Sequence, residues 1–466
     1  MSDQKTPGEL LREKLFLKQE HAGKKMSDGQ IDDADLFCEH YKSFLNTAKT
    51  EREAVTFAVS EAEKHGFVPF VPGQKYAAGD KVFVNNRGKA AIFAVIGQQS
   101  VSEGVNISAA HVDVPRLDLK PNPLYEDHEL ALFKTHYYGG IKKYQWTAVP
   151  LALHGVIIKS GGEKITVNIG EDPQEPCFVV TDLLPHLSAE QFKRPANELI
   201  KGEELNLLVG SRPFRDDKAS ERVKLNILNL LFEKYGMIER DFLSAELEAV
   251  PLFPVRDVGL DRSLIGGYGH DDRVCAYTAL RALLDTGSCE KTAVAVLTDK
   301  EETGSDGNTG LHSVYLQTFI YDLAAAEGVP VHMVLSRSRC LSADVNAAID
   351  PTFSDVLENR NAARLNYGVC VTKYTGSRGK ADTSDASAEY VASVCEMLDH
   401  AGVIWQTGEL GKVDFGGGGT VAKYIANLDV DVVDVGVPVL SMHSPFEIVS
   451  KLDVFMAYRT FFEFFK

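Results

Sequence analysis

Apolar residues along the chain recur with two different periods. Between residues 8 and 65 they stand at helical spacing among charged residues, and Gly66 ends that pattern. The apolar runs 81–84 and 90–96 then flank the turn sequence Asn85-Asn-Arg-Gly88, which is typical of a β-hairpin. The N-terminal part is therefore predicted to be an amphipathic helical region followed by the first strands of a sheet.

Two later apolar runs end in residues that can carry chemistry. Residues 105–110 lead directly into His111, and the run 292–297 leads into a sharp loop with Glu301 and Glu302. Such runs are typical of strands buried on both faces of a mostly parallel sheet. Because α/β proteins bind ligands at the carboxyl ends of these strands, both loops are candidate sites.

From about residue 117 to 250 the pattern changes to short segments rich in aromatic residues and turns, such as Trp146–Ile158. This predicts a β-rich module inserted into the first domain. A chain of 466 residues also exceeds what one hydrophobic core usually supports. We therefore expect residues 1–116 and 251–466 to form an α/β domain, with a mixed, mostly parallel sheet sandwiched by helices.

After the insert, helices and strands alternate again. The pattern predicts a helix over 271–285 and strands near 331–335 and before Ala343. Near the C-terminus, Ser444-Pro445-Phe446-Glu447 has the form of a capping box with proline at the first helical position. A final helix with a wide apolar face is predicted to begin at Pro445.

Charge and composition limit the classes of partner that the protein is expected to bind. The formal net charge of −17 disfavours nucleic acid and anionic membranes. No apolar run approaches the roughly 18 to 20 residues that span a bilayer, and the N-terminal residues lack the apolar core of a signal peptide. The seven cysteines are scattered, which indicates reduced thiols rather than a disulfide framework. We expect a cytoplasmic protein.

The adjacent carboxylates of Glu301 and Glu302 are the first chemical signal. Neighbouring carboxylates raise each other's pKa unless a cation or hydrogen-bond donors offset them. The pair therefore suggests a metal ligand beside a general base. The alternative is a solvated acidic loop.

Five other residues occupy comparable positions. His111 and Asp113 share one face of a strand end, so Asp113 can orient the imidazole while its other nitrogen binds a metal. Asp271 precedes an apolar helix and Asp344 follows an apolar segment, and each has helix capping as an alternative. His443 lies between a predicted strand and the final helix, where a core histidine is the alternative.

Taken together, five of these side chains could form one centre with two imidazoles and three carboxylates: His111, Asp271, Glu302, Asp344 and His443. With one ligand bridging, this set suits two divalent ions about 3.5–4 Å apart that share a water. Soft sulfur ligands are absent from the set, so zinc is the first choice, with cobalt or manganese as alternatives.

The motifs around these residues resemble those of the M18 aminopeptidases, which belong to the di-zinc exopeptidase clan and include aspartyl aminopeptidase. They are Ala110–Arg116, Gly269–Arg273, Asp299–Ser305, Ser342–Ala347 and Ser441–Glu447. The resemblance implies that His111 and Asp344 bind one metal, that Glu302 and His443 bind the other, and that Asp271 bridges. It also implies that Glu301 is the general base on a metal-bridging water and that Asp113 orients His111.

The resemblance further implies an assembly. Family members use the inserted β module, here residues 117–250, as a dimerisation domain, and dimers build a dodecameric tetrahedral shell. Pro185-His186-Leu187 resembles a segment whose histidine reaches a neighbouring subunit's active site, which would give His186 a substrate role. The alternative is an ordinary surface histidine.

Two further segments are candidates for substrate binding. Lys380 lies where acid-preferring family members carry a substrate-binding lysine, but the residues around it depart from the pattern, so the preferred N-terminal residue stays open. Gly416–Gly419 and Thr420 lack the ending of a nucleotide P-loop. They suggest close backbone approach to a substrate at Gly418 and Thr420, with a packing-driven glycine turn as the alternative.

These observations predict a metallo-aminopeptidase (EC 3.4.11.-) that hydrolyses N-terminal residues from peptides and assembles as a homo-oligomer. Acidic N-terminal residues are one candidate preference. Two alternatives remain. One is a related di-metal deacylase or carboxypeptidase, and the other is a catalytically silent shell protein that only binds peptides.

Overall fold

Three β-sheets organise the computed structural model, which describes residues 5–466. The largest has nine strands, and its central neighbours β14, β4, β15 and β19 are parallel while β2 and β3 run antiparallel. The expected mixed α/β sheet is therefore confirmed. In spatial order its strands are β1 (Val68–Pro69), β2 (Lys81–Asn86), β3 (Ala90–Val95), β14 (Ala293–Thr298), β4 (Asn106–His111), β15 (Arg339–Ser342), β19 (Asp431–Gly436), β17 (Val369–Thr372) and β18 (Trp405–Thr407).

Helices cover both faces of this sheet. Alternate residues of β14 enter different cores: Ala295 and Leu297 pack with one set of helices, and Val294 and Val296 with the other. The first set is α3 (Asp28–Thr47), α4 (Glu51–Lys64), α6 (His270–Asp285), α9 (Ala388–His400) and α11 (Lys451–Phe465). The second set is α7 (Tyr315–Glu327), α8 (Val331–Leu335) and α10 (Ala422–Ala426). Double-sided burial explains why the central strands read as continuous apolar runs.

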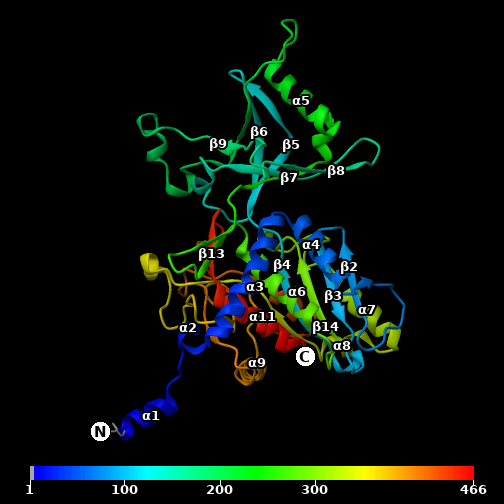
Figure 1. Ribbon diagram of the computed structural model, residues 1–466, viewed down its shortest axis with the longest axis vertical. Helices are drawn as coiled ribbons and strands as arrows, with labels where there is room; N and C mark the ends of the chain where they lie inside the picture. The colour runs from blue at the N-terminus through cyan, green and yellow to red at the C-terminus, as the bar shows by residue number, and fades with distance from the viewer. Residues whose placement is uncertain (1–4) are drawn as a thin grey trace.

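All strands between residues 116 and 251 form a separate antiparallel sheet with its own core. Figure 1 shows this sheet and α5 (Arg222–Tyr235) standing apart from the helix-covered sheet. Its use as a dimerisation domain stays a prediction. In spatial order the strands are β8 (Lys164–Ile169), β7 (Leu151–Ile158), β11 (Glu246–Pro251), β5 (Arg116–Asp127), β6 (Leu130–Tyr138), β10 (Leu207–Gly210) and β9 (Val179–Val180).

A third, five-stranded sheet carries two of the candidate site loops. Its strands are β12 (Arg256–Val258), β13 (Leu264–Gly267), β21 (Glu447–Ser450), β20 (Pro438–Leu440) and β16 (Asn346–Ala347). The loop after β13 begins α6, and the loop between β20 and β21 carries His443. Two short helices, α1 (Pro7–Leu15) and α2 (Ala22–Lys25), precede α3. No helix within residues 5–466 is both long and apolar enough to cross a membrane.

Two predicted elements are wrong. Residues 331–335 form helix α8, not a strand, because Val334 and Leu335 turn toward the core while His332 stays exposed. The C-terminal helix begins at Lys451 with Ser450 as its cap, not at Pro445. Residues 447–450 instead pair with β13 and β20, and the Glu447 carboxylate accepts backbone N–H groups from other loops.

A buried histidine joins the insert to the main domain. His154 on β7 places Nδ1 2.8 Å from Glu53 Oε1 of α4 and Nε2 3.0 Å from Glu171 Oε1. Lys49 also contacts Glu171, at 2.8 Å. Burial alone would lower the pKa of His154, but the hydrogen bonds to Glu171 and Glu53 raise it above its usual value. The two carboxylates therefore favour the charged form of the imidazole.

This arrangement predicts a pH-dependent stability. The unfolded pKa of histidine is about 6.5 and the folded pKa is raised, so the stabilisation is complete below about pH 6.5 and is lost as the pH rises through the folded pKa. His154→Gln should lower the melting temperature most at pH 6, and the deficit should shrink toward pH 9. Charge-assisted hydrogen bonds of this kind contribute about 1.5–3 kcal/mol each.

The exposed His136 offers a control on the same sheet, and His136→Gln should leave the melting temperature unchanged at both pH values. A His154→Gln deficit that stayed constant or grew with pH would contradict a charged His154.

Candidate metal centre

The carboxyl ends of three adjacent parallel strands meet at one edge of the main sheet. β4 lies between β14 and β15, and the register pairs His111 with Thr298. His111 ends β4, the loop after β14 carries Glu301 and Glu302, and Asp344 follows β15. This is the edge at which α/β sheets bind ligands, as the sequence predicts.

The third sheet supplies Asp271 and His443 to the same place. Asp271 is the second residue of α6 and has non-helical backbone angles. His443 lies in the β20–β21 loop with a positive φ of 64°. The structure therefore brings all five predicted ligand residues together. Helix capping by Asp344 is wrong as an alternative, because the short strand β16 follows this residue.

Both histidines are oriented in the same way. Nδ1 of His111 lies 2.9 Å from the Asp113 backbone oxygen, and Nδ1 of His443 lies 2.7 Å from the Gly140 backbone oxygen. A neutral imidazole donates one N–H and keeps one lone pair. Donation to these carbonyls leaves each Nε2 lone pair directed into the centre.

The Asp271 carboxylate lies between the two histidines. Its Oδ1 is 3.2 Å from Nε2 of His111, and its Oδ2 is 3.1 Å from Nε2 of His443. Beyond these contacts, Asp344 Oδ1 lies 3.9 Å from His111 Nε2, and Glu302 Oε2 lies 3.5 Å from His443 Nε2. Asp271 thus lies between the His111–Asp344 pair and the Glu302–His443 pair.

The donor set fits divalent cations. The ligand atoms of His111, Glu301 and Asp344 lie within 4.8 Å of one another, as do those of His111, Asp271 and Glu302. Glu302 Oε1 is buried and has no hydrogen-bond partner within residues 5–466. A cation between these groups would satisfy that oxygen and the histidine lone pairs. Imidazole and carboxylate ligands without sulfur suit zinc and similar metals.

Burial and mutual repulsion perturb the carboxyl groups. Burial raises the pKa of Glu301 to about 7, with the charges of Asp113 and Asp271 adding to the effect. Burial and Asp271 raise the pKa of Glu302 well above its usual value. Burial alone would also raise the pKa of Asp271, but its contacts with His111 and His443 lower it. Positive charge at this centre would relieve the repulsion.

Asp113 connects one histidine to the glutamate loop. Its carboxylate is fully buried and accepts the backbone N–H of Glu301 at 3.1 Å and that of Glu302 at 3.2 Å. Its Oδ1 also lies 3.4 Å from Nδ1 of His111. One buried side chain therefore fixes the relative positions of His111, Glu301 and Glu302.

Sequence reasoning missed three residues that support the centre. The Tyr138 hydroxyl, at the end of β6, donates to Asp113 Oδ2 at 2.7 Å, and Gly140 supplies the carbonyl that holds His443. Glu447 is fully buried and accepts the backbone N–H of Asp271 at 3.0 Å and that of His443 at 2.7 Å. Tyr138 and Gly140 belong to the insert, and no local pattern in the sequence links them to the motifs.

A cavity of about 620 Å³ opens beside the centre. Glu301, Gly418 and Thr420 are among the residues that line it. The Thr420 hydroxyl donates to Asp434 at 2.8 Å. Gly416–Gly419 do not directly precede an α-helix, because α10 begins at Ala422. The cavity also contains Lys423, which sequence reasoning did not select.

Two predicted substrate residues lie elsewhere. Lys380 donates to Asp385 at 2.7 Å and lies 3.8 Å from the ring centre of Tyr374, and it is not among the residues that line the cavity. His186 lies in the short 3₁₀ helix Pro185–Leu187 of the insert, is exposed, and does not line its own chain's cavity.

Comparison with known proteins gives a consistent result. The family described as Aminopeptidase I zinc metalloprotease (M18) matches residues 44–465. The chain is 46% identical over 457 residues to a probable M18 family aminopeptidase 1 of Clostridium acetobutylicum, covering 96% of this chain and 97% of the relative. It is 47% identical over 441 residues to the corresponding Thermotoga maritima protein, covering 93% and 96%.

Solved structures agree with these relatives. The crystal structure of the M18 aminopeptidase from Thermotoga maritima matches with a TM-score of 0.92 at 44% identity, covering 97% of this chain and all of the other. The S. cerevisiae mApe1 dodecamer matches with a TM-score of 0.75 at 21% identity, covering 94% and 97%. The second match shows a shared fold alone.

The contact of Tyr138 with Asp113 yields a prediction. Tyr138→Phe removes one hydroxyl and keeps the ring, which stacks 4.0 Å from the Arg116 guanidinium. Losing a partner that orients a ligand system typically costs about 10–100-fold in metal affinity. Zinc affinity, measured by competition with a chromogenic chelator, should fall by that factor.

Tyr137→Phe is the matched control, because Tyr137 is the preceding residue on β6 and is partly exposed. It should bind zinc as tightly as the unmodified protein. Equal zinc affinity for Tyr138→Phe and the unmodified protein would show that the hydroxyl does not support the centre.

Proposed function

The chain belongs to the M18 family of zinc aminopeptidases, and we propose that its five clustered histidine and carboxylate side chains hold two divalent ions that serve hydrolysis of a peptide's N-terminal residue. His111 and Asp344 would bind one ion, Glu302 and His443 the other, and Asp271 both. The observation that carries this proposal is the position of Asp271, which presents a different oxygen to each histidine. Zinc is the family's metal, and cobalt or manganese are alternatives.

The metals would supply Lewis-acid polarisation of the peptide carbonyl and would lower the pKa of the attacking water. Glu301 is the general base that takes a proton from this water and returns it to the leaving amine. Its position in the lining of the cavity beside the clustered ligands supports this role. Asp113 and Tyr138 hold the loop that carries Glu301.

The side chain of the substrate's N-terminal residue would meet a mixed surface in the cavity. Lys423 and Met442 both line the cavity, and Lys380 does not. Lys423 lies 3.8 Å from Asp382, whereas Lys380 donates to Asp385 at 2.7 Å. We therefore assign any contact with an acidic side chain to Lys423 rather than Lys380. Gly418 would approach the substrate through its backbone. Thr420 would position this loop, since its hydroxyl already donates to Asp434.

The family assignment makes the chain an aminopeptidase, so the deacylase, carboxypeptidase and silent-shell alternatives have no support. A cytoplasmic location is consistent with seven free cysteines, because reducing compartments keep thiols unpaired.

We also propose a homo-oligomeric shell, a dodecamer built from dimers, in which the insert forms subunit contacts. A dodecamer is reported for the mApe1 protein that shares this fold. The segment around His186 exposes four large apolar side chains, Leu183, Leu184, Leu187 and Phe192. Exposed large apolar side chains gathered within one short segment are typical of a protein interface. His186 would then complete the site of a neighbouring subunit.

The general-base assignment predicts different outcomes for two adjacent substitutions. Glu301→Gln removes a proton acceptor and should lower kcat by about 10²-fold or more while zinc content stays normal. Glu302→Gln weakens a ligand and should lower zinc content measured by elemental analysis. Normal turnover of zinc-replete Glu301→Gln would refute the role of Glu301, and unchanged zinc in Glu302→Gln would refute that of Glu302.

The shared-site hypothesis predicts complementation between subunits. His186→Ala should lose activity and keep its zinc, because the His186 imidazole would contact the substrate in the neighbouring subunit and bind no metal. Mixed oligomers of His186→Ala and Glu301→Gln subunits contain sites with an intact base and an intact histidine, so activity should return. An oxyanion contact of this kind is worth about 2.7–4 kcal/mol. Inactive mixed oligomers, or a fully active His186→Ala, would return His186 to an ordinary surface role.

A further inference from the structure

The N-terminal helix α1 presents apolar residues without a partner. None of its nine residues, 7–15, is buried. Leu10, Leu11 and Leu15 on the helix and Phe16 and Leu17 after it are each more than half exposed. Figure 1 shows α1 projecting away from the rest of the chain. An isolated helix of this length is marginal in water, so it needs a partner surface to persist.

The sequence nevertheless favours a helix here. Thr6 and Glu9 form a capping box, and Pro7 occupies the first helical position. The segment also has a distinct charge: four cationic side chains, Lys5, Arg12, Lys14 and Lys18, against the two carboxylates Glu9 and Glu13. Residues 5–18 therefore carry a net charge of +2 on a chain of net charge −17, whereas α1 itself is neutral, with Arg12 and Lys14 in its last turn against Glu9 and Glu13. The cations of this segment are electrostatically complementary to that chain's own surface.

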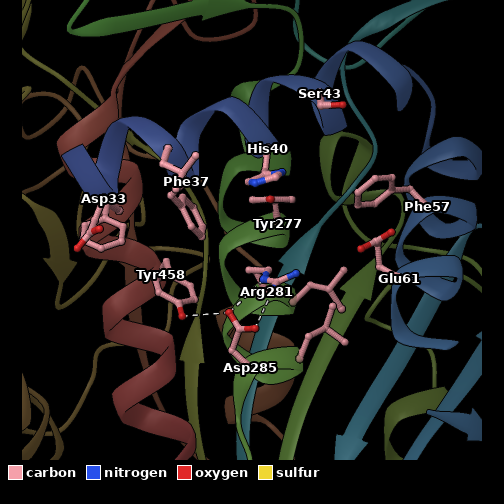
Figure 2. A pocket seen from close by; sticks show the side chains of 14 residues that line it. Asp33, Phe37, His40, Ser43, Phe57, Glu61, Tyr277, Arg281, Asp285 and Tyr458 are labelled. Carbon is pink, nitrogen blue, oxygen red and sulfur yellow. Dashed lines mark hydrogen bonds and ion pairs between the residues drawn. The ribbon is translucent and has the colours of Figure 1, made fainter. Parts of the chain in front are cut away.

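A groove with matching properties lies between helices α3, α4, α6 and α11. Its volume is about 670 Å³, and Figure 2 shows the side chains that line it. The rings of Phe37, Phe57, Tyr277 and Tyr458 line it, and Leu36 stands 64% exposed at its edge. Ring contacts fix the aromatic lining, with centroids 4.7 Å apart for Phe37 and Tyr458. The groove is therefore built before any partner arrives.

Three carboxylates line the groove, and two of them already have cationic partners. Glu61 pairs with Lys64 at 2.7 Å, and Asp285 pairs with Arg281 at 2.6 Å and 3.0 Å. Asp33 has no ion-pair partner among the described residues. Asp33 is therefore the carboxylate available to Arg12 or Lys14 of α1, while the aromatic lining matches the apolar side chains of that helix.

We propose that α1 of one copy of this chain docks into the groove between α3, α4, α6 and α11 of a second copy. The leucines of α1 cover the aromatic lining, and its last-turn cations Arg12 and Lys14 meet Asp33. The position of α1 favours a second copy over the same chain. The chain after α1 is fixed at Ala22, which is buried and whose N–H donates to the Asn366 carbonyl at 2.6 Å. Figure 1 shows α1 pointing outward from there.

Directed cross-linking tests this contact without relying on hydrolysis. Two differently tagged chains are co-expressed, one with Leu11→Cys and the other with Ser43→Cys, a conservative change on the groove. Both carry Cys177→Ser and Cys395→Ser, which remove the more accessible native thiols. A short bismaleimide should link the two tagged chains in high yield.

Tyr321→Cys replaces Ser43→Cys in the control, because Tyr321 is also exposed but lies on α7, which covers the opposite face of the sheet. This pair should not cross-link. Adding Arg12→Glu and Lys14→Glu to the Leu11→Cys chain should lower the yield severalfold, whereas Arg12→Lys should preserve it.

The same experiment distinguishes other occupants. A chain carrying both Leu11→Cys and Ser43→Cys, co-expressed with an unmodified partner, reports intrachain capture by peptide mapping. Intrachain capture without capture between tagged chains would overturn the proposal in favour of the chain's own helix. No capture in either arrangement would overturn it in favour of a different partner protein.

Discussion

The structure depends on one carboxylate held between two imidazoles. Asp271 presents Oδ1 to His111 and Oδ2 to His443 at nearly equal distances, 3.2 Å and 3.1 Å. Burying this carboxylate with Glu302 and Asp344 is costly unless positive charge compensates them. Both histidines donate Nδ1–H to backbone carbonyls, so each Nε2 lone pair faces the centre. The negative charge of the carboxylates is therefore balanced when cations bind there.

This constraint explains why all three sheets supply residues to the metal centre. The main sheet supplies His111, Glu302 and Asp344 at three strand ends, and the third sheet supplies Asp271 and His443. Glu447 ties the latter two loops together through their backbone N–H groups. The insert adds the Tyr138 hydroxyl and the Gly140 carbonyl, so it supports its own chain's centre as well as any neighbour's. Movement of the insert would therefore alter the metal centre.

The sequence predicted the parts of this account that local patterns encode. Buried parallel strands have continuous apolar runs, so the positions of His111, Glu301 and Asp344 at their ends could be inferred. Contacts between distant segments could not be inferred in this way: nothing near Tyr138 or Gly140 indicates their partners. Short runs were also ambiguous. Residues 331–335 suit a strand or a helical turn, and Glu447 suits a capping box until its bonds to Asp271 and His443 are seen.

The most direct test of the central claim is anomalous diffraction from crystals of the zinc-loaded protein, recorded on both sides of the zinc absorption edge. The account predicts two anomalous peaks in each chain, on either side of the Asp271 carboxylate. One peak should lie toward His111 and Asp344, and the other toward Glu302 and His443. A single peak, or peaks that do not contact Asp271, would contradict it.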